Sequence, residues 1–146
     1  MCIRDSFLVI IIGSVYGSVS GFMVGASTIL VSNFLLGHGP WTPYQMMALG
    51  LVGFFAGLIQ TRNRILLKAY SIFAAYFYGF TTDLFWWSAF AAEHNIQTYL
   101  AVASAGLPMD TARAVGNVLF MLAFSQPLLK ILGRFKNRFY FKVAGR

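Results

Sequence analysis

The sequence is poor in charge, cysteine and proline. Charged residues make up 10% of its 146 residues, against about a quarter in an ordinary soluble domain, so too few charges exist to cover the surface of a soluble globule. No Asp, Glu, Lys or Arg occurs from Ser6 to Thr61. Cys2 is the only cysteine, which excludes an intrachain disulfide and a thiolate metal cluster.

Apolar residues dominate the sequence: 58% of the residues are hydrophobic, and many of them lie in long stretches without charge. A helix of about 20 apolar residues crosses the hydrocarbon core of a bilayer. The sequence therefore predicts an all-α protein, a polytopic transmembrane helical bundle of about four to five spans. Its environment would be the lipid bilayer.

Residues 7–36 are uncharged and longer than one span requires. One interpretation is a single tilted helix with a glycine at every fourth position for close packing. The other is a turn around Tyr16–Ser20 followed by a second span that begins at Gly21. The excess length and the serines of this stretch favour the turn.

The remaining chain divides at clear breaks. Gly37–Pro43 holds two prolines and two glycines and cannot continue a helix. Spans are predicted over Tyr44–Ile59 and Ile65–Ala92. Thr98–Met109 is predicted to be a loop or a short interfacial helix. Asp110 is then the N-cap of a last span that runs to about Leu132.

Three segments follow from this reading. Residues 1–6 are expected to be a non-native or disordered start, on a chain that has lost its true N-terminus. Residues 7–134 form a single transmembrane domain, and residues 135–146 form a basic cytoplasmic tail. A homologous full-length reading frame that begins at the same Met would contradict the first expectation.

Basic residues cluster in two places, Arg62–Lys68 and Lys130–Arg146, which together hold nine of the eleven. Two spans separate these clusters, so both lie on one side of the membrane, and Lys and Arg mark the cytoplasmic side. We therefore expect a multi-pass protein of the cell membrane with a cytoplasmic C-terminus. His38–Pro43 and Glu93–Asp110 then face outward. Nucleic-acid binding is disfavoured, because it needs a basic face on a soluble fold.

Motifs for catalysis are missing from the sequence: it contains no phosphate-binding loop, no His-Glu-x-x-His, no Gly-x-Ser-x-Gly and no paired carboxylates. His38 and His94 fall on separate outer loops, and two histidines without a carboxylate make a poor metal site. We expect no enzymatic activity, no metal and no cofactor.

A few polar residues lie in or beside the apolar segments. Asp83 is a candidate functional residue, because ionisable groups at membrane depth usually serve function; the alternative is a structural Asp paired with backbone or with Arg113. Trp86 and Trp87 either stack on a planar ligand or anchor their helix at the interface, the role that the enrichment of Trp there favours. Asn117, one turn from Arg113, either lines a polar pocket or holds two helices together.

These residues predict an outward-facing aromatic pocket for a small ligand that carries a ring and some polar substituents. The predicted substrate-binding residues are His38, Gly39, Pro40, Trp41, Thr42, Gln45, Asp83, Trp86, Trp87, Arg113 and Asn117.

The stretch Gly21–Met46 closely resembles the substrate-binding S components of energy-coupling factor (ECF) vitamin transporters, most specifically in Val31–Phe34 and Gly39–Pro43. Gly50–Gly57 looks like the next helix of that family. Asp110, Ala114–Asn117 and Gln126–Leu129 are similar to its last span and basic exit.

The resemblance implies six helices with both termini cytoplasmic and a vitamin or related micronutrient bound from outside. It also implies separate partners, a membrane scaffold subunit and two ATPases, that drive uptake. This chain has room for four to five spans, and the family's first helix has no counterpart in it. The alternative is a structural or assembly subunit without a ligand, in which the polar groups only hold helices together.

Overall fold

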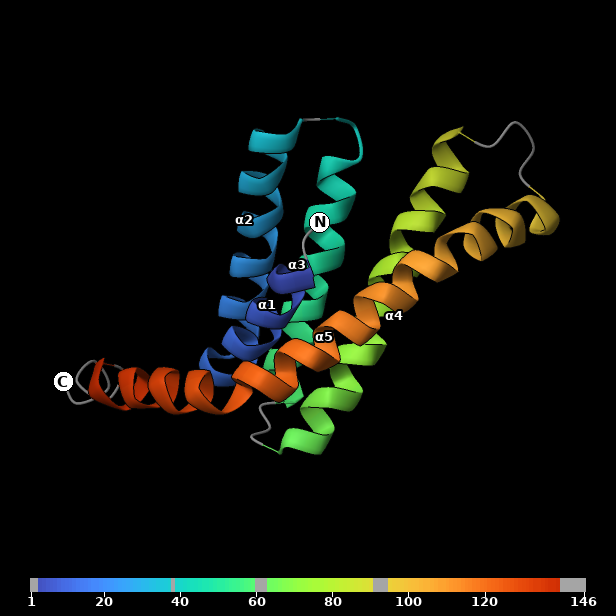
Figure 1. The fold of residues 1–146 in the computed structure, drawn as a ribbon. Helices are drawn as coiled ribbons and strands as arrows, with labels where there is room; N and C mark the ends of the chain where they lie inside the picture. The colour runs from blue at the N-terminus through green and yellow to red at the C-terminus, as the bar shows by residue number, and fades with distance from the viewer. Residues whose placement is uncertain (1–2, 38, 60–62, 91–94, 140–146) are drawn as a thin grey trace.

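A computed structural model describes residues 3–37, 39–59, 63–90 and 95–139, and the regular structure in these residues is helical. The five described helices are α1 (Ile3–Tyr16), α2 (Ser18–Leu36), α3 (Thr42–Ile59), α4 (Arg64–Phe90) and α5 (Ile96–Phe139). Figure 1 shows α2 and α3 as one antiparallel pair and α4 and α5 as another. The predicted all-α bundle is confirmed.

Among the described residues, α2, α3 and α5 are long and apolar enough to cross a membrane. Helices of this length and composition identify the chain as a membrane protein. Helix α1 is apolar but has only 14 residues, a length of about 21 Å. It is too short to cross the hydrocarbon core of about 30 Å along the membrane normal.

The turn between α1 and α2 lies at Gly17, so the two-segment interpretation of residues 7–36 is confirmed. The backbone of Gly17 has a φ of 103°, a conformation that favours glycine because it has no side chain to clash. The second segment begins at Ser18, three residues earlier than predicted.

Helix α1 lies at the centre of the fold and contacts each of the other four helices. Its side chains form much of the core, with Phe7, Val9, Ile10 and Ile11 almost fully buried. Because α1 begins at Ile3, the domain boundary that the sequence predicts before residue 7 falls inside a helix.

Helices α2 and α3 pack backbone against backbone at their glycines. A Cβ atom added to Gly21 would meet the carbonyl of Gly53, and a Cβ on Gly53 would meet the carbonyl of Gly21. Gly25 lies equally close to the Leu49 backbone, and Gly57 to the Ser18 backbone. Small residues allow this close approach, which is how membrane helices gain van der Waals contact without a hydrophobic driving force.

Thr98–Met109 is neither a loop nor a separate short helix, and Asp110 is not an N-cap, so both predictions are wrong. Both regions belong to α5, which is continuous from Ile96 through Pro108. Packing on α4 explains the difference: the Trp87 indole donates a hydrogen bond to Thr98 Oγ1 at 3.0 Å, and Tyr99 packs edge-on against Phe80 and Trp87. These contacts offset the backbone hydrogen bond that a proline removes.

The last part of α5 turns away from the direction of its first part (Figure 1). The helix has 44 residues, about 66 Å, which is twice the thickness of a hydrocarbon core. Pro127 lies inside it and removes a backbone hydrogen bond, a common cause of a kink. Lys136 then donates a hydrogen bond to the Val15 carbonyl near the end of α1. The predicted tail from residue 135 thus begins within a helix.

Two ends of the bundle can be distinguished in Figure 1. At one, which we call the hairpin end, α2 passes to α3 and α4 passes to α5. The opposite end carries the α1–α2 turn, the end of α3 and the start of α4.

Candidate functional site

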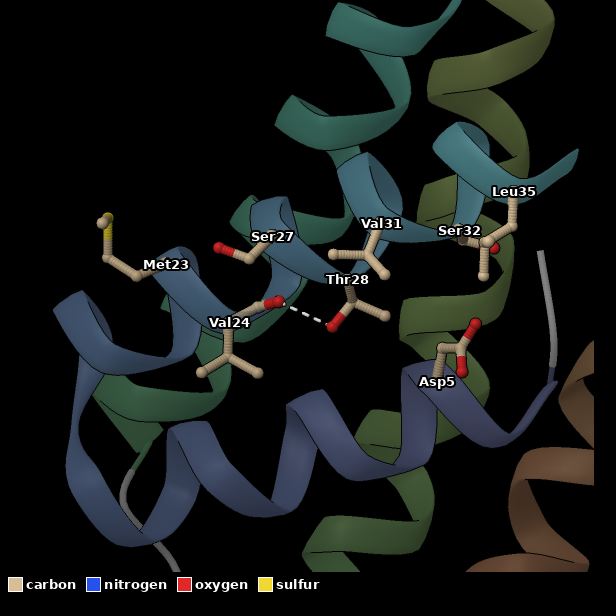
Figure 2. A pocket seen from close by; sticks show the side chains of 8 residues that line it. All are labelled: Asp5, Met23, Val24, Ser27, Thr28, Val31, Ser32 and Leu35. Carbon is tan, nitrogen blue, oxygen red and sulfur yellow. Dashed lines mark hydrogen bonds between the residues drawn. The ribbon is translucent and has the colours of Figure 1, made fainter. Parts of the chain in front are cut away.

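The hollows among the described residues include two that are lined by polar side chains and differ in chemistry. The larger is a groove of about 540 Å³ between α1 and α2, which diverge from their turn (Figure 2). Thr28 and Ser27 lie on its wall, but Thr28 Oγ1 donates to the Val24 carbonyl at 2.7 Å and is already satisfied. Asp5 is its one charged lining residue among those described. None of the predicted binding residues that the structure describes lines this groove.

The smaller cavity, of about 210 Å³, lies between α3, α4 and α5. Its described lining is Gln45, Tyr78, Thr82, Asp83, Trp86, Gly106, Met109, Asp110 and Arg113. Polar groups from three helices converge on it, which is typical of a ligand site. Although this cavity is the smaller of the two, its chemistry makes it the candidate functional site.

Helix periodicity places most of these side chains. On α4, Tyr78, Thr82 and Trp86 recur every four residues and share one face, and Asp83 is adjacent to it. On α5, Gly106, Asp110 and Arg113 follow the spacing of four and then three residues that also defines one face. The two faces oppose each other across the cavity.

Arg113 and Asp110 form an ion pair on the α5 side of the cavity, with 2.7 Å between Arg113 Nη1 and Asp110 Oδ1. The side chains are 24% and 7% exposed, respectively. The guanidinium also lies over the Tyr78 ring, 5.4 Å from its centroid, in a cation–π arrangement. Gly79 makes room for the carboxylate, because a Cβ there would meet Asp110.

The α2–α3 connection and the start of α3 contact α4 through aromatic rings, one of which, Trp86, lines the cavity. Trp41 stacks on Trp86 with ring centroids 6.2 Å apart and planes 17° from parallel, and Tyr44 stacks on Phe85 at 4.3 Å. Gly39 lies against the Trp41 ring, where a Cβ would meet the indole. The connection is thereby held to α4 by aromatic contacts.

Asn33 at the end of α2 orders the start of α3. Its Nδ2 donates to Thr42 Oγ1 and to Gln45 Oε1, at 3.0 Å each. The Gly39 amide also donates to Thr42 Oγ1, at 3.4 Å. Thr42 is buried and does not line the cavity, so its place is structural, whereas Gln45 reaches the lining.

Four of the predicted residues therefore meet at one cavity: Gln45, Asp83, Trp86 and Arg113. Trp41 and Gly39 belong to the connection above it, and Pro40 is exposed there. Trp87 instead packs on α5, where its indole donates to Thr98. His38 and His94 lie outside the described residues.

Asn117 lies away from the cavity lining. It is 1% exposed, and its Nδ2 donates to the Ser71 carbonyl on α4 at 3.4 Å. This contact links α4 to α5, as the helix-to-helix interpretation of the residue expects.

The sequence prediction missed Tyr78, Thr82, Gly106, Met109 and Asp110. The i, i+4 spacing of Tyr78, Thr82 and Trp86 is a signal that could have found the first two. The α5 residues could not be found while Thr98–Met109 was taken as a loop.

The comparisons with known proteins give no match: no protein-family model, no curated protein and no solved structure matches the chain.

Proposed function

We propose that this protein is the substrate-capture subunit of an ATP-driven ECF-type importer and binds a vitamin or related micronutrient at the cavity between α3, α4 and α5. One observation carries the proposal: Gln45, Asp83, Trp86 and Arg113 converge from three helices on one cavity. Binding sites of membrane bundles are built in this way, from side chains of facing helices. The chain performs no covalent step. A membrane scaffold and two ATPases, as separate chains, would supply the driving force.

The direct test is ligand binding by purified full-length protein in lipid nanodiscs. A panel of water-soluble vitamins and nucleobase-like compounds is added, and the unfolding temperature is followed by tryptophan fluorescence. A ligand at 100 times its Kd stabilises a folded protein by about 2.7 kcal/mol, so a binder is readily detected. If no compound raises the melting temperature of a protein that is folded, the proposal is wrong, and a structural subunit without a ligand explains the fold better.

We also propose that the protein crosses the membrane several times, with the hairpin end outside and the C-terminus in the cytoplasm. The support is the charge at the end of the last apolar segment, where the basic residues Lys130, Arg134 and Arg138 lie. Lys and Arg at the end of a membrane span favour the cytoplasmic side. In a Cys2→Ser background, Pro40→Cys should react with a membrane-impermeant maleimide in intact cells. Arg138→Cys should react only after permeabilisation, and the reverse labelling would contradict this orientation.

The α2–α3 connection would act as a cover over the bound ligand. Gly39→Ala places a methyl group against the Trp41 ring and should disturb its stacking on Trp86. Aromatic pairs contribute about 0.5–1.5 kcal/mol beyond burial, so the affinity for a ligand found in the panel should fall about 2- to 10-fold. Leu36→Ala, an exposed change near the same connection, is the matched control and should leave the affinity unchanged. Equal affinities in both variants would contradict the covering role.

A further inference from the structure

The cavity between α3, α4 and α5 carries an uneven set of charges. Asp83, Asp110 and Arg113 all line it, and Arg113 is the one basic side chain among its described lining residues. The Asp110–Arg113 ion pair at 2.7 Å uses that single positive charge. One carboxylate, that of Asp83, therefore remains without a matching cation in the lining that the structure describes.

A second observation is independent of these charges. Tyr78 is 2% exposed, and its hydroxyl is a buried group with no hydrogen-bond partner. A buried polar group without a partner costs free energy, and such groups are uncommon in folded proteins. Because Tyr78 lines the same cavity, a ligand that enters it can supply the missing partner.

The surroundings limit what such a ligand can be. The volume of about 210 Å³ is below the range of roughly 300–1,000 Å³ that is usual for small-molecule sites, so a compact group fits. Trp86 offers an aromatic wall, and aromatic faces attract organic cations. An anion would meet two carboxylates against one guanidinium, and like charges at close range are unfavourable.

We propose that this cavity selects a compact organic cation, an ammonium or a positively charged heteroaromatic ring, whose charge lies at the Asp83 carboxylate while a polar substituent reaches the Tyr78 hydroxyl. The inference rests on the proposed function and names its substrate class. The bound cation would also supply the counter-charge that the Asp83 carboxylate needs inside a membrane bundle.

Three probes of nearly the same shape test the selectivity for charge: 1-methylnicotinamide is a cation, nicotinamide is neutral and nicotinate is an anion. Their affinities are measured by calorimetry on the full-length protein in nanodiscs at fixed salt. The cation should bind at least 10-fold more tightly than nicotinamide, and nicotinate should bind most weakly. Equal or tighter binding of nicotinate, or no binding of any of the three, would overturn the inference.

Two variants test which side chains cause the preference for the cation. Asp83→Asn keeps the Asp110–Arg113 pair and should reduce the preference for the cation over nicotinamide at least 10-fold. Tyr78→Phe should weaken both amide-bearing probes without changing their order. An unchanged preference in Asp83→Asn would overturn the assignment to Asp83, and the comparison of probes on the unaltered protein holds even if a variant does not fold.

Different results would contradict the capture function and the preference for a cation. If a vitamin from the panel binds but is neutral or anionic, and Asp83→Asn binds it as well as the unaltered protein does, then the charge inference is wrong and the capture function stands. If no vitamin binds, the capture function itself is wrong.

Discussion

Alanine in place of Gly53 is expected to lower the melting temperature of the protein by several degrees, up to roughly 10 °C. The added Cβ would meet the Gly21 carbonyl of α2 and the Val9 side chain of α1. Backbone atoms cannot move away as a rotating side chain can, so α2 and α3 must separate. Overpacking costs about 1–3 kcal/mol or more, and each kcal/mol shifts the melting temperature of a chain of this size by about 2–4 °C. Tryptophan fluorescence on heating in detergent measures the shift.

Gly50→Ala on the same helix is the matched control. A Cβ there meets the Phe22 ring, 2.8 Å from the nearest ring atom, and a side chain can move where a backbone cannot. Both changes gain the same helix propensity over glycine, so the difference between them isolates the contact between α2 and α3. Equal melting temperatures would mean that the close packing of Gly21 and Gly53 contributes nothing to stability.

Neutralising Arg113 is expected to destabilise the protein more than neutralising either of its acidic neighbours. In Arg113→Gln, both Asp83 and Asp110 stay in the cavity without a basic partner among its described lining residues. Removing one member of a buried pair costs about 3–5 kcal/mol, because the remaining charge is uncompensated. In Asp110→Asn, Arg113 still has Asp83 beside the same cavity, so the loss should be smaller.

Asp83→Asn completes this series and provides its control, because it leaves the 2.7 Å ion pair in place. It should be the least harmful of the three changes when no ligand is bound. Melting temperatures of the three variants and of the Asp110→Asn/Arg113→Gln double variant measure the coupling. If Asp110→Asn melted below Arg113→Gln, the excess negative charge assigned to the cavity would be contradicted.

The break at Gly17 and the α2–α3 pair were predictable from the sequence, because both depend on local features. Glycine interrupts a helix where the backbone requires a positive φ, as at Gly17 and Gly37. The second break is shorter than the predicted Gly37–Pro43, because α3 begins at Thr42. The length of uncharged sequence set the number of apolar segments. The close contact of Gly21 with Gly53 was not predictable, since the spacing of glycines does not say which helix they meet.

The course of α5 was mispredicted because its cause is tertiary. Thr98–Met109 contains Gly106 and Pro108, which locally argue for a loop, yet contacts of Thr98 and Tyr99 with Trp87 on α4 hold the segment helical. Once this segment is helical, Asp110 faces the cavity with Arg113 instead of capping a helix. The error in secondary structure therefore removed three of the nine described lining residues from the prediction: Gly106, Met109 and Asp110.

The α4 half of the site was partly predictable. Asp83 drew attention as an ionisable residue among apolar ones, and Trp86 as an indole that could stack on a planar ligand. No role was predicted for Tyr78 from the sequence. Its importance comes from a buried, unpaired hydroxyl, which depends on its neighbours in space.

The central claim is that the small cavity between α3, α4 and α5, and not the larger groove between α1 and α2, holds the ligand. Leucine at Gly106 tests it directly, because even a Cβ at this position lies 2.8 Å from the Asp83 carboxylate and a larger side chain fills the cavity. Ser27→Leu fills the other groove, whose wall Ser27 forms (Figure 2). Both variants and the unaltered protein are purified folded, and the small molecules that they retain are released and identified by mass spectrometry. We predict that the unaltered protein and Ser27→Leu retain the same compound and that Gly106→Leu loses it; retention by Gly106→Leu with loss from Ser27→Leu would contradict the account.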